Sequence, residues 1–368
     1  MERLLITLIL VCTMNNITNA QNPFYGQYHT PHEAVPFDRI ETEHYEPAIL
    51  EGIKLQNAEI EAIIQNPEKA DFTNTIEAFE ESGKLLDKVV AVFGNMLSAE
   101  TNDDLQELAQ KIMPLLSEHS NNITLNEKLF ARVKEVYNQK ETLQLTQEQK
   151  QLLENAYNSF IRHGANLEGE AREEYRRLTT ELSKLTLTFS ENNLKETNAY
   201  QMLLTKKESL AGLPEIIIEA AAETAKNEEK EGWAFTLHAP SYIPFMTYSD
   251  NRDLRQKLYM AYNTKCTHDN EFNNIDIVKK IANTRMKIAQ LLGYKDYAEY
   301  TLKKRMAENS KSVYKLLNQL LEAYTPTAQQ EYKEIQELAR EEQGADFVVM
   351  PWDWSCLLYT SPSPRDIS

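Results

Sequence analysis

Apolar residues recur at three- and four-residue steps along most of the chain, and this spacing is typical of amphipathic α-helices. One stripe runs from Ile76 to Phe93, and Asn74 and Glu77 resemble a capping box with Asn74 as the N-cap. Longer stripes predict helices over 168–198 and 312–342, and Pro326 predicts a kink or a split in the second. Shorter stripes predict helices over 105–116, 129–136, 152–161, 214–221, 250–262 and 274–291. The sequence therefore predicts an all-α protein.

Two segments depart from the helical period. Trp233 to Leu237 alternates in the manner of a strand, and 241–247 is a candidate second extended piece that Pro244 would confine to a sheet edge. We therefore expect one minor strand or hairpin region near 233–247. Residues 21–47 are rich in Pro, Tyr and His and lack a helical period, which predicts an extended N-terminal arm before a helical body at 48–355.

Residues 1–20 are typical of a secretory signal peptide. The apolar run from Leu4 to Val11 is too short to span a bilayer as a helix, and Ala20 offers a small residue at the cleavage site. This segment predicts a secreted or periplasmic protein. The alternatives are a buried first helix and a lipoprotein leader modified at Cys12, although Val11 stands where such a leader would carry a small residue.

Charge and cysteine content exclude several classes of protein. The 39 Lys and Arg against 56 Asp and Glu give a net charge of −17, which repels phosphate backbones and argues against nucleic acid as a partner. Cys12 lies in the leader and Cys356 near the end, so Cys266 has no disulfide partner within the predicted body. Apart from the leader, no stretch is apolar enough to predict a transmembrane span.

The strongest motif for a zinc site on a helix, H-E-x-x-H, is approached once. His32-Glu33-Ala34-Val35-Pro36 has Pro where the second His is needed and lies in the non-helical arm, so we interpret His32 as a surface or packing residue. The remaining histidines have no second His or Cys at ligand spacing; they are His29, His44, His119, His163, His238 and His268. We interpret His119 and His163 as residues at helix C-termini, and only His238, where the predicted strand ends, as a candidate for a pocket.

The other candidate chemistry is weak. Cys266-Thr267-His268 offers a thiol beside an imidazole, but no orienting third group lies nearby in sequence. Pairs of neighbouring carboxylates such as Glu173-Glu174 do not converge on one point when they lie on a helix. From motifs alone we assign no catalytic, cofactor-binding or metal-binding residue to this chain.

Six sequence blocks, in order along the chain, nevertheless carry a specific resemblance. The blocks are PFD at 36–38, FTNTIEAFEESGKLLDKVVAVFGNM at 72–96, LNE at 125–127, FTLHAPSYIPFMTYSDNRDLRQKLYMAYNTK at 235–265, NNIDIVKKIANTRMKIAQLLGYKDYAEYTLKKRMA at 273–307 and PWDW at 351–354. Together they resemble the N-terminal part of the thimet oligopeptidase-like zinc metallopeptidases, and most of all their peptidyl-dipeptidase (dipeptidyl carboxypeptidase) branch. The resemblance covers residues 23–355.

The resemblance implies the N-terminal half of an elongated, two-lobed, nearly all-helical channel peptidase. In that family the zinc ligands and the general base follow the Trp-Asp-Trp segment, so zinc is expected in the full-length parent and none bound to this chain. Short peptides are the implied substrates, and the missing C-terminal half is the implied partner. This chain alone is expected to be inactive, with apolar faces exposed where that half would pack. The alternative is a non-catalytic helical binding or scaffold protein.

The last residues, 356–368, do not continue the helical pattern. Ser361-Pro362-Ser363-Pro364 cannot prolong a helix, because each Pro lacks a backbone donor and restricts the residue before it. The segment CLLYTSPSPRDIS resembles an in-frame translation of a transposase-type sequencing-library adapter. We therefore expect a junction after Ser355, followed by a non-native tail.

Overall fold

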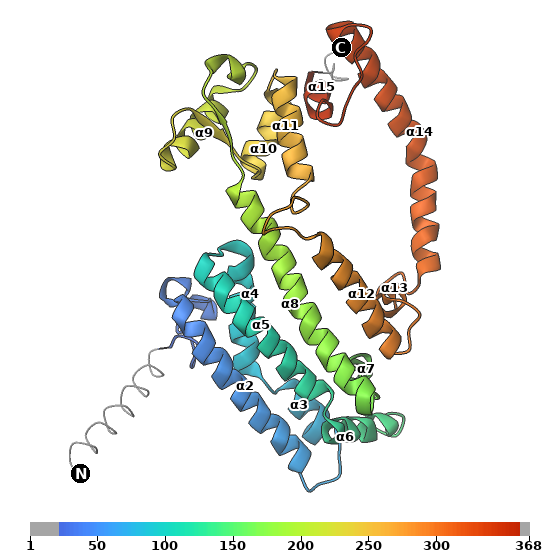
Figure 1. Ribbon diagram of the computed structural model, residues 1–368. Helices are drawn as coiled ribbons and strands as arrows, with labels where there is room; N and C mark the ends of the chain where they lie inside the picture. The colour runs from blue at the N-terminus through green and yellow to red at the C-terminus, as the bar shows by residue number, and fades with distance from the viewer. Residues whose placement is uncertain (1–21, 361–368) are drawn as a thin grey trace, which may run out of the picture. The chain divides into compact units, whose positions relative to one another are not determined.

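The computed structural model describes residues 22–360, so the predicted signal peptide and the end of the predicted tail lie outside the described residues (Figure 1). Within that range the chain forms two compact units. Unit 1 comprises residues 22–187 and 284–294, and unit 2 comprises residues 188–283 and 295–360. Both units are mainly helical, which confirms the predicted all-α class.

Unit 1 begins with two short 3₁₀ turns, η1 and η2, and continues as a series of helices. Their bounds are η1 Pro31–Glu33, η2 Phe37–Arg39, α2 Thr42–Gln65, the π-helical turn η3 Phe72–Glu77, α3 Ala78–Glu80, α4 Lys84–Ala99, α5 Asp103–Thr124, α6 Glu127–Asn138, α7 Gln147–Arg162 and the first part of α8 Gly169–Ala199. The side chains of Asn102, Asn126 and Thr146 accept the backbone N–H three residues on, which fixes where α5, α6 and α7 begin.

The core of unit 1 has two main clusters. In one, Tyr45 of α2 packs its ring 5.2 Å from that of Phe93 in α4, beside the fully buried Val89 and Ile112. In the other, Phe160 of α7 lies between the rings of Phe79 and Phe130. These aromatic contacts explain why the apolar stripes predicted helices correctly: each stripe faces the next helix of the unit.

Two expectations for unit 1 are wrong in detail. The first concerns Asn74, which is not an N-cap: Asp71 caps the π-helical turn and accepts from the Asn74 N–H at 2.7 Å. The stripe from Ile76 to Phe93 is also interrupted, because Gly83 adopts a left-handed φ of 80° that separates α3 from α4. The second concerns the predicted arm at 21–47, which ends early because α2 begins at Thr42 and includes Pro47.

Unit 2 contains the two strands and the remaining helices. Their bounds are β1 Met202–Leu204, the 3₁₀ turn η4 Lys207–Leu210, α9 Glu215–Asn227, β2 Trp233–Phe235, α10 Ala239–Tyr248, α11 Arg252–Asn263, the first part of α12 Ile275–Leu291, α13 Tyr297–Leu302, α14 Ser310–Gln343 and α15 Trp354–Thr360. The predicted strand at 233–237 is confirmed as β2, and it pairs antiparallel with β1, with Met202 opposite Phe235. Strand β1 was not predicted from the sequence.

The second extended piece predicted at 241–247 is wrong, because these residues belong to helix α10. Pro240 lies in the first turn, where its missing N–H would have no helical partner in any case. Phe245 is fully buried and packs edge-on against Phe235 of β2, with ring centroids 4.6 Å apart. This burial favours the helix even though Pro244 removes one of its hydrogen bonds. Similarly, α14 runs through Pro326 without the predicted split.

Candidate functional site

The most densely connected polar cluster in the described residues surrounds Asp353, between α14 and α15. Its side chain is fully buried. Arg252 donates to the carboxylate from Nε at 3.0 Å and from Nη2 at 2.7 Å, and Arg255 donates from Nη2 at 2.9 Å. The Met350 backbone N–H donates to the same carboxylate at 3.0 Å. Four donors from two segments about 100 residues apart therefore converge on one carboxylate.

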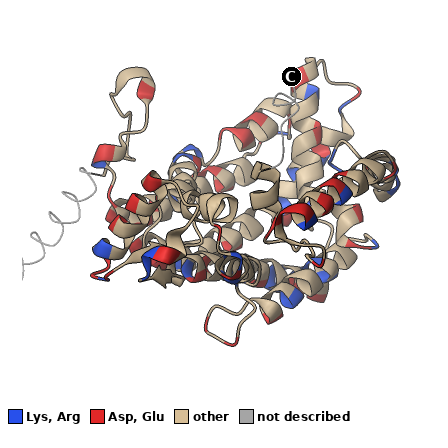
Figure 2. Cartoon of the chain, turned by 90° about the horizontal axis from the view of Figure 1, so that it is seen from above, with Lys and Arg blue, Asp and Glu red and all other residues tan. Residues whose placement is uncertain are grey.

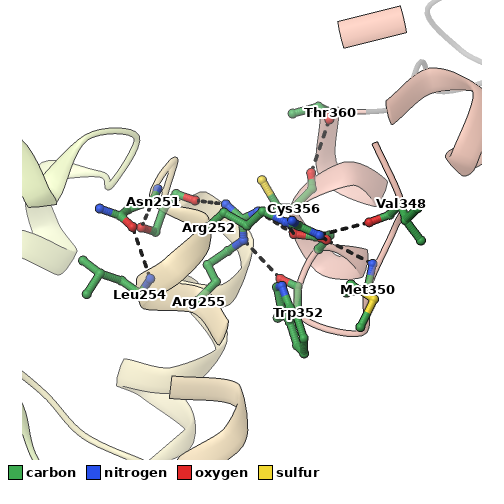
Figure 3. Close-up of polar contacts among 11 residues, drawn as sticks. Asn251, Arg252, Leu254, Arg255, Val348, Met350, Trp352, Cys356 and Thr360 are labelled. Atoms are coloured by element: carbon green, nitrogen blue, oxygen red, sulfur yellow. Dashed lines mark hydrogen bonds and ion pairs between the residues drawn. The ribbon is translucent and has the colours of Figure 1, made fainter. Parts of the chain in front are cut away.

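Helix α11 places both arginines on the same side. Asn251 caps this helix by accepting from the Leu254 N–H at 3.1 Å, so Arg252 and Arg255 stand in its first turns, three positions apart. Two cations at a helix N-terminus oppose the helix dipole, and the carboxylate of Asp353 offsets that repulsion. Figure 3 shows both side chains reaching from α11 toward the segment that follows α14.

Each arginine also binds backbone carbonyls, so the cluster is more than an ion pair. Arg255 donates to the oxygens of Ser249 at 2.7 Å and Trp352 at 3.1 Å. Arg252 donates to the Val348 oxygen at 3.0 Å and lies 4.4 Å over the ring of Phe347. The two guanidinium groups therefore fasten the whole 347–353 segment to the start of α11.

The surroundings of Asp353 keep its carboxylate charged and hydrogen-bonded. Burial by itself would raise the pKa of Asp353, but hydrogen bonds from Arg252, the Met350 N–H and Arg255 outweigh it and hold the pKa below its usual range. The bond to Asp353 in turn raises the pKa of Arg252. A carboxylate with this many donors does not take up protons near neutral pH, so Asp353 is suited to anchoring and not to acid–base catalysis.

One helix spans the position after Ser355 where the junction is predicted, and the non-native origin of the tail stays a prediction. Helix α15 begins at Trp354 and continues to Thr360, which places Cys356 inside it. Leu357 is buried beside Ile335 and Val349, and Tyr359 packs edge-on against Tyr248 of α10. Burial raises the pKa of the Cys356 thiol, so this cysteine is held as an unreactive thiol.

His32, His163 and His238 each have their own local partners or surroundings. His32 lies exposed in a 3₁₀ turn with a φ of 59°, outside any α-helix. His163 ends α7, as predicted, with Nδ1 2.8 Å from the Ser159 oxygen. His238 precedes α10 and bonds the side chains of Thr236 and Asn198, each at 3.1 Å, so its polar atoms have partners.

The expectation for His119 is wrong. It lies inside α5 and not at its end, is 6 % exposed, and its Nε2 is 2.7 Å from Gln56 Oε1 of α2. Burial lowers the pKa of this imidazole, because the charged form would lose its hydration. His119 is therefore a neutral hydrogen-bonding residue of the core of unit 1.

Cys266 and His268 come close to a common carboxylate but do not form a nucleophilic pair. The Cys266 backbone N–H donates to Glu196 Oε2, and His268 Nε2 lies 3.9 Å from Glu196 Oε1. Burial, together with the hydrogen bond to Glu196, raises the pKa of the Cys266 thiol to about 11. A thiol with that pKa is almost entirely protonated at neutral pH, so it is a poor nucleophile.

The residues from 22 to 360 do not fit a zinc centre. No group of three His, Cys, Asp or Glu side chains among them is placed to hold a metal ion. The charged residues in this range are instead spread along the helices, with acidic and basic side chains interspersed (Figure 2). None of the helices in the same range combines the length and the apolar character that a bilayer crossing needs.

The arginine–aspartate cluster was missed from the sequence. Its signal was present in the Arg252-x-x-Arg255 spacing after a helix cap and in Asp353 between two tryptophans. An acidic residue in so apolar a setting is buried only when it is paired. Its partners could not be identified from the sequence, because they lie about 100 positions away.

Comparison with known sequences now defines the class of protein. The profile of peptidase family M3 matches residues 245–362, a range that includes both arginines and Asp353. The chain is 34 % identical over 335 residues to the dipeptidyl carboxypeptidase of Escherichia coli, covering 91 % of this chain and 49 % of that protein. It is 30 % identical over 336 residues to oligopeptidase A of Salmonella typhimurium, covering 90 % and 49 % respectively.

These matches confirm the resemblance found in the sequence blocks, including the one to the peptidyl-dipeptidase branch. The chain belongs to peptidase family M3. It spans about half the length of these curated relatives.

Proposed function

We propose that this chain is the N-terminal part of a zinc peptidase of family M3 that hydrolyses short peptides, releasing dipeptides from their C-terminus. The observation that carries the proposal is the match to dipeptidyl carboxypeptidase, which spans 91 % of this chain and 49 % of the relative. Substrate class and reaction come from that relationship, as expected from the sequence blocks.

In this proposal the zinc ligands and the general base lie in the part of the protein that follows. A zinc ion held there would supply an activated water molecule for hydrolysis of the peptide bond. The described residues of this chain contribute no ligand; they supply one wall and part of the floor of the peptide channel. Their own chemistry is anchoring: Asp353 holds the 347–353 segment at the start of α11.

We also propose that the protein is exported, to the periplasm or beyond, by means of residues 1–20. The support is the short apolar run that ends at Val11 and the small residue Ala20. N-terminal sequencing of protein recovered outside the cytoplasm tests this proposal. A mature chain that begins at Met1 contradicts it.

The experiment for the catalytic proposal begins with the source DNA. The reading frame is sequenced through the codon of Ser355, and the longest continuous product is expressed beside this chain of 368 residues. The longer product should bind one zinc ion per chain, release C-terminal dipeptides from short peptides, and lose that activity with a chelator. This chain alone should do none of these.

Two results would overturn the proposal. One is a native reading frame that encodes residues 356–368 and then stops, which would favour the non-catalytic helical binding protein. The other is a longer product that is folded and loaded with zinc but releases no dipeptide from short peptides.

A further inference from the structure

Helix α14 carries an apolar face that the rest of unit 2 leaves uncovered over its first half. Its members recur at three- and four-residue steps, so they lie on one side of the helix. They are Val313, Leu316, Leu317, Leu320, Leu321 and Tyr324, and we call them the α14 stripe. Leu317 is 51 % exposed, Leu321 66 % and Tyr324 65 %. Leucine and tyrosine exposed together over three helical turns form a patch typical of an interaction surface.

The same side of α14 is buried at the other end of the helix. Ile335 and Ala339 continue the spacing of the stripe, and they pack against Val349 and Leu357. Gln336 fixes this end with hydrogen bonds to the Phe347 oxygen at 2.8 Å and the Val349 N–H at 3.0 Å. This side of the helix therefore carries apolar residues near both ends, which are covered near its C-terminus and open near its N-terminus.

The opposite side of the stripe segment is polar. Lys315, Asn318, Gln319 and Glu322 alternate with the stripe residues and are all exposed. Within unit 2, α14 contacts α13 near its start and α15 near its end (Figure 1). Leucine side chains gain nothing from exposure to water, and here they lie on one side of the helix. The amphipathic pattern therefore indicates a packing partner on that side only.

We propose that the α14 stripe is the docking surface for the C-terminal half of the same polypeptide in an M3 peptidase of family length. This rests on the proposed function, because that half is the part of the relatives that this chain does not span. The relatives are about twice as long as the matched region, so a comparable length of polypeptide accompanies it in them. The stripe also lies inside the range matched by the family profile, 245–362.

A second copy of the chain fits the stripe less well. The stripe is 12 residues long, and a helix of that length extends only about 18 Å. Two such segments bury less than the ~1,200 Å² from which stable interfaces begin. Each copy also carries a net charge of −17, which opposes self-association. A domain of the same polypeptide is covalently linked to the stripe, so it can stay docked over a smaller area.

Hydrogen–deuterium exchange followed by mass spectrometry tests the proposal on two proteins: this chain alone, and the longer product of the native reading frame. Peptides that cover 313–324 should exchange quickly in the first and ~10-fold or more slowly in the second. Peptides that cover 335–339 provide the internal control, since that segment is buried in the chain as it stands.

A matched pair of variants separates docking from general damage. Leu320→Asp lies on the stripe and Gln319→Asp lies beside it on the polar side. In this chain alone both variants should melt at the temperature of the parent. In the longer product only Leu320→Asp should restore fast exchange at 313–324 and lower the melting temperature.

Each remaining outcome overturns the proposal. Slow exchange at 313–324 in this chain alone would show that unit 1 or a second copy covers the stripe, and a dimer abolished by Leu320→Asp would identify the second copy. Fast exchange in a longer product that hydrolyses peptides would leave the catalytic proposal intact and exclude this docking. A native frame that ends at residue 368 removes the proposed occupant.

Discussion

Arg255 Nη2 lies 2.9 Å from Asp353 Oδ1, and the two side chains are 7 % and 0 % exposed although they are 98 positions apart in the chain. Removing one partner of such a pair strongly lowers the free energy of unfolding, because the remaining charge stays buried without its partner. It therefore provides the most direct measure of how unit 2 is held together.

Replacement of Asp353 should be severely destabilising. Asp353→Ala leaves two guanidinium groups without their carboxylate, and we expect a loss of ~3–5 kcal/mol in the free energy of unfolding. Urea titration followed by tryptophan fluorescence measures this loss in unit 2, because all three tryptophans, Trp233, Trp352 and Trp354, belong to that unit. The control is Asp276→Asn, whose exposed pair with Lys279 should contribute less than about 1 kcal/mol. Equal effects of the two variants would contradict the anchoring role.

The contribution of Asp353 should vanish in acid. Its pKa in the folded chain is below the ordinary value of 3.8, so the unfolded chain takes up the proton first as pH falls. The stabilisation is therefore fully present above pH 3.8 and is lost as pH falls through the lower, folded value. The difference in unfolding free energy between the parent and Asp353→Asn should be constant from pH 7 to 5 and shrink below pH 4. A difference that grows in acid would contradict this sign.

Cys266 should resist alkylation while the chain is folded. Its thiol is buried and its pKa is raised to about 11, so little thiolate forms at pH 8. In a Cys12→Ser, Cys356→Ser background, iodoacetamide should label Cys266 at least ~100-fold more slowly than it labels free cysteine, whose pKa is near 8.5. Labelling in urea should restore the ordinary rate. Fast labelling of the folded chain would mean that the site opens or that the thiol is activated.

Gly212 should not tolerate a side chain. Its φ is 82°, and an added Cβ would lie 2.2 Å from the Tyr248 oxygen. Gly212→Ala therefore combines strain with a backbone clash, and we expect a loss of ~2 kcal/mol or more. Gly94→Ala is the matched control: that glycine lies inside α4 with no atom near the added methyl, so it should stabilise by ~0.5–1 kcal/mol. Thermal melts check both predictions: the melting temperature should fall for Gly212→Ala and rise for Gly94→Ala.

The parts of the fold predicted correctly from sequence are those set by local physics. The helices predicted over 129–136, 152–161 and 274–291 are all present, because the apolar spacing is local and because caps such as Asn126 and Thr146 depend on a few neighbouring residues. The misassigned parts are those where distant packing decides. Residues 241–247 contain Pro244 and could be extended locally, but burial of Phe245 against β2 makes them a helix.

In the candidate site, too, local features could be predicted from the sequence and contacts between distant residues could not. Absence of an H-E-x-x-H motif could be read directly from the sequence, since that motif is local. The cluster of Arg252, Arg255 and Asp353 could not, since no periodicity connects residues about 100 positions apart. His119 was misplaced for a related reason: its hydrogen bond to Gln56 of another helix, and not its own helix end, determines its environment.

The long separation within the Asp353 cluster also bears on how the chain is made. During synthesis the two arginines of α11 leave the ribosome about 100 residues before the aspartate that neutralises them. Closing a loop of that length costs conformational entropy that only the completed contacts repay. Unit 2 therefore cannot finish folding on the nascent chain until Asp353 has emerged, whereas most of unit 1, up to residue 187, is already outside the ribosome.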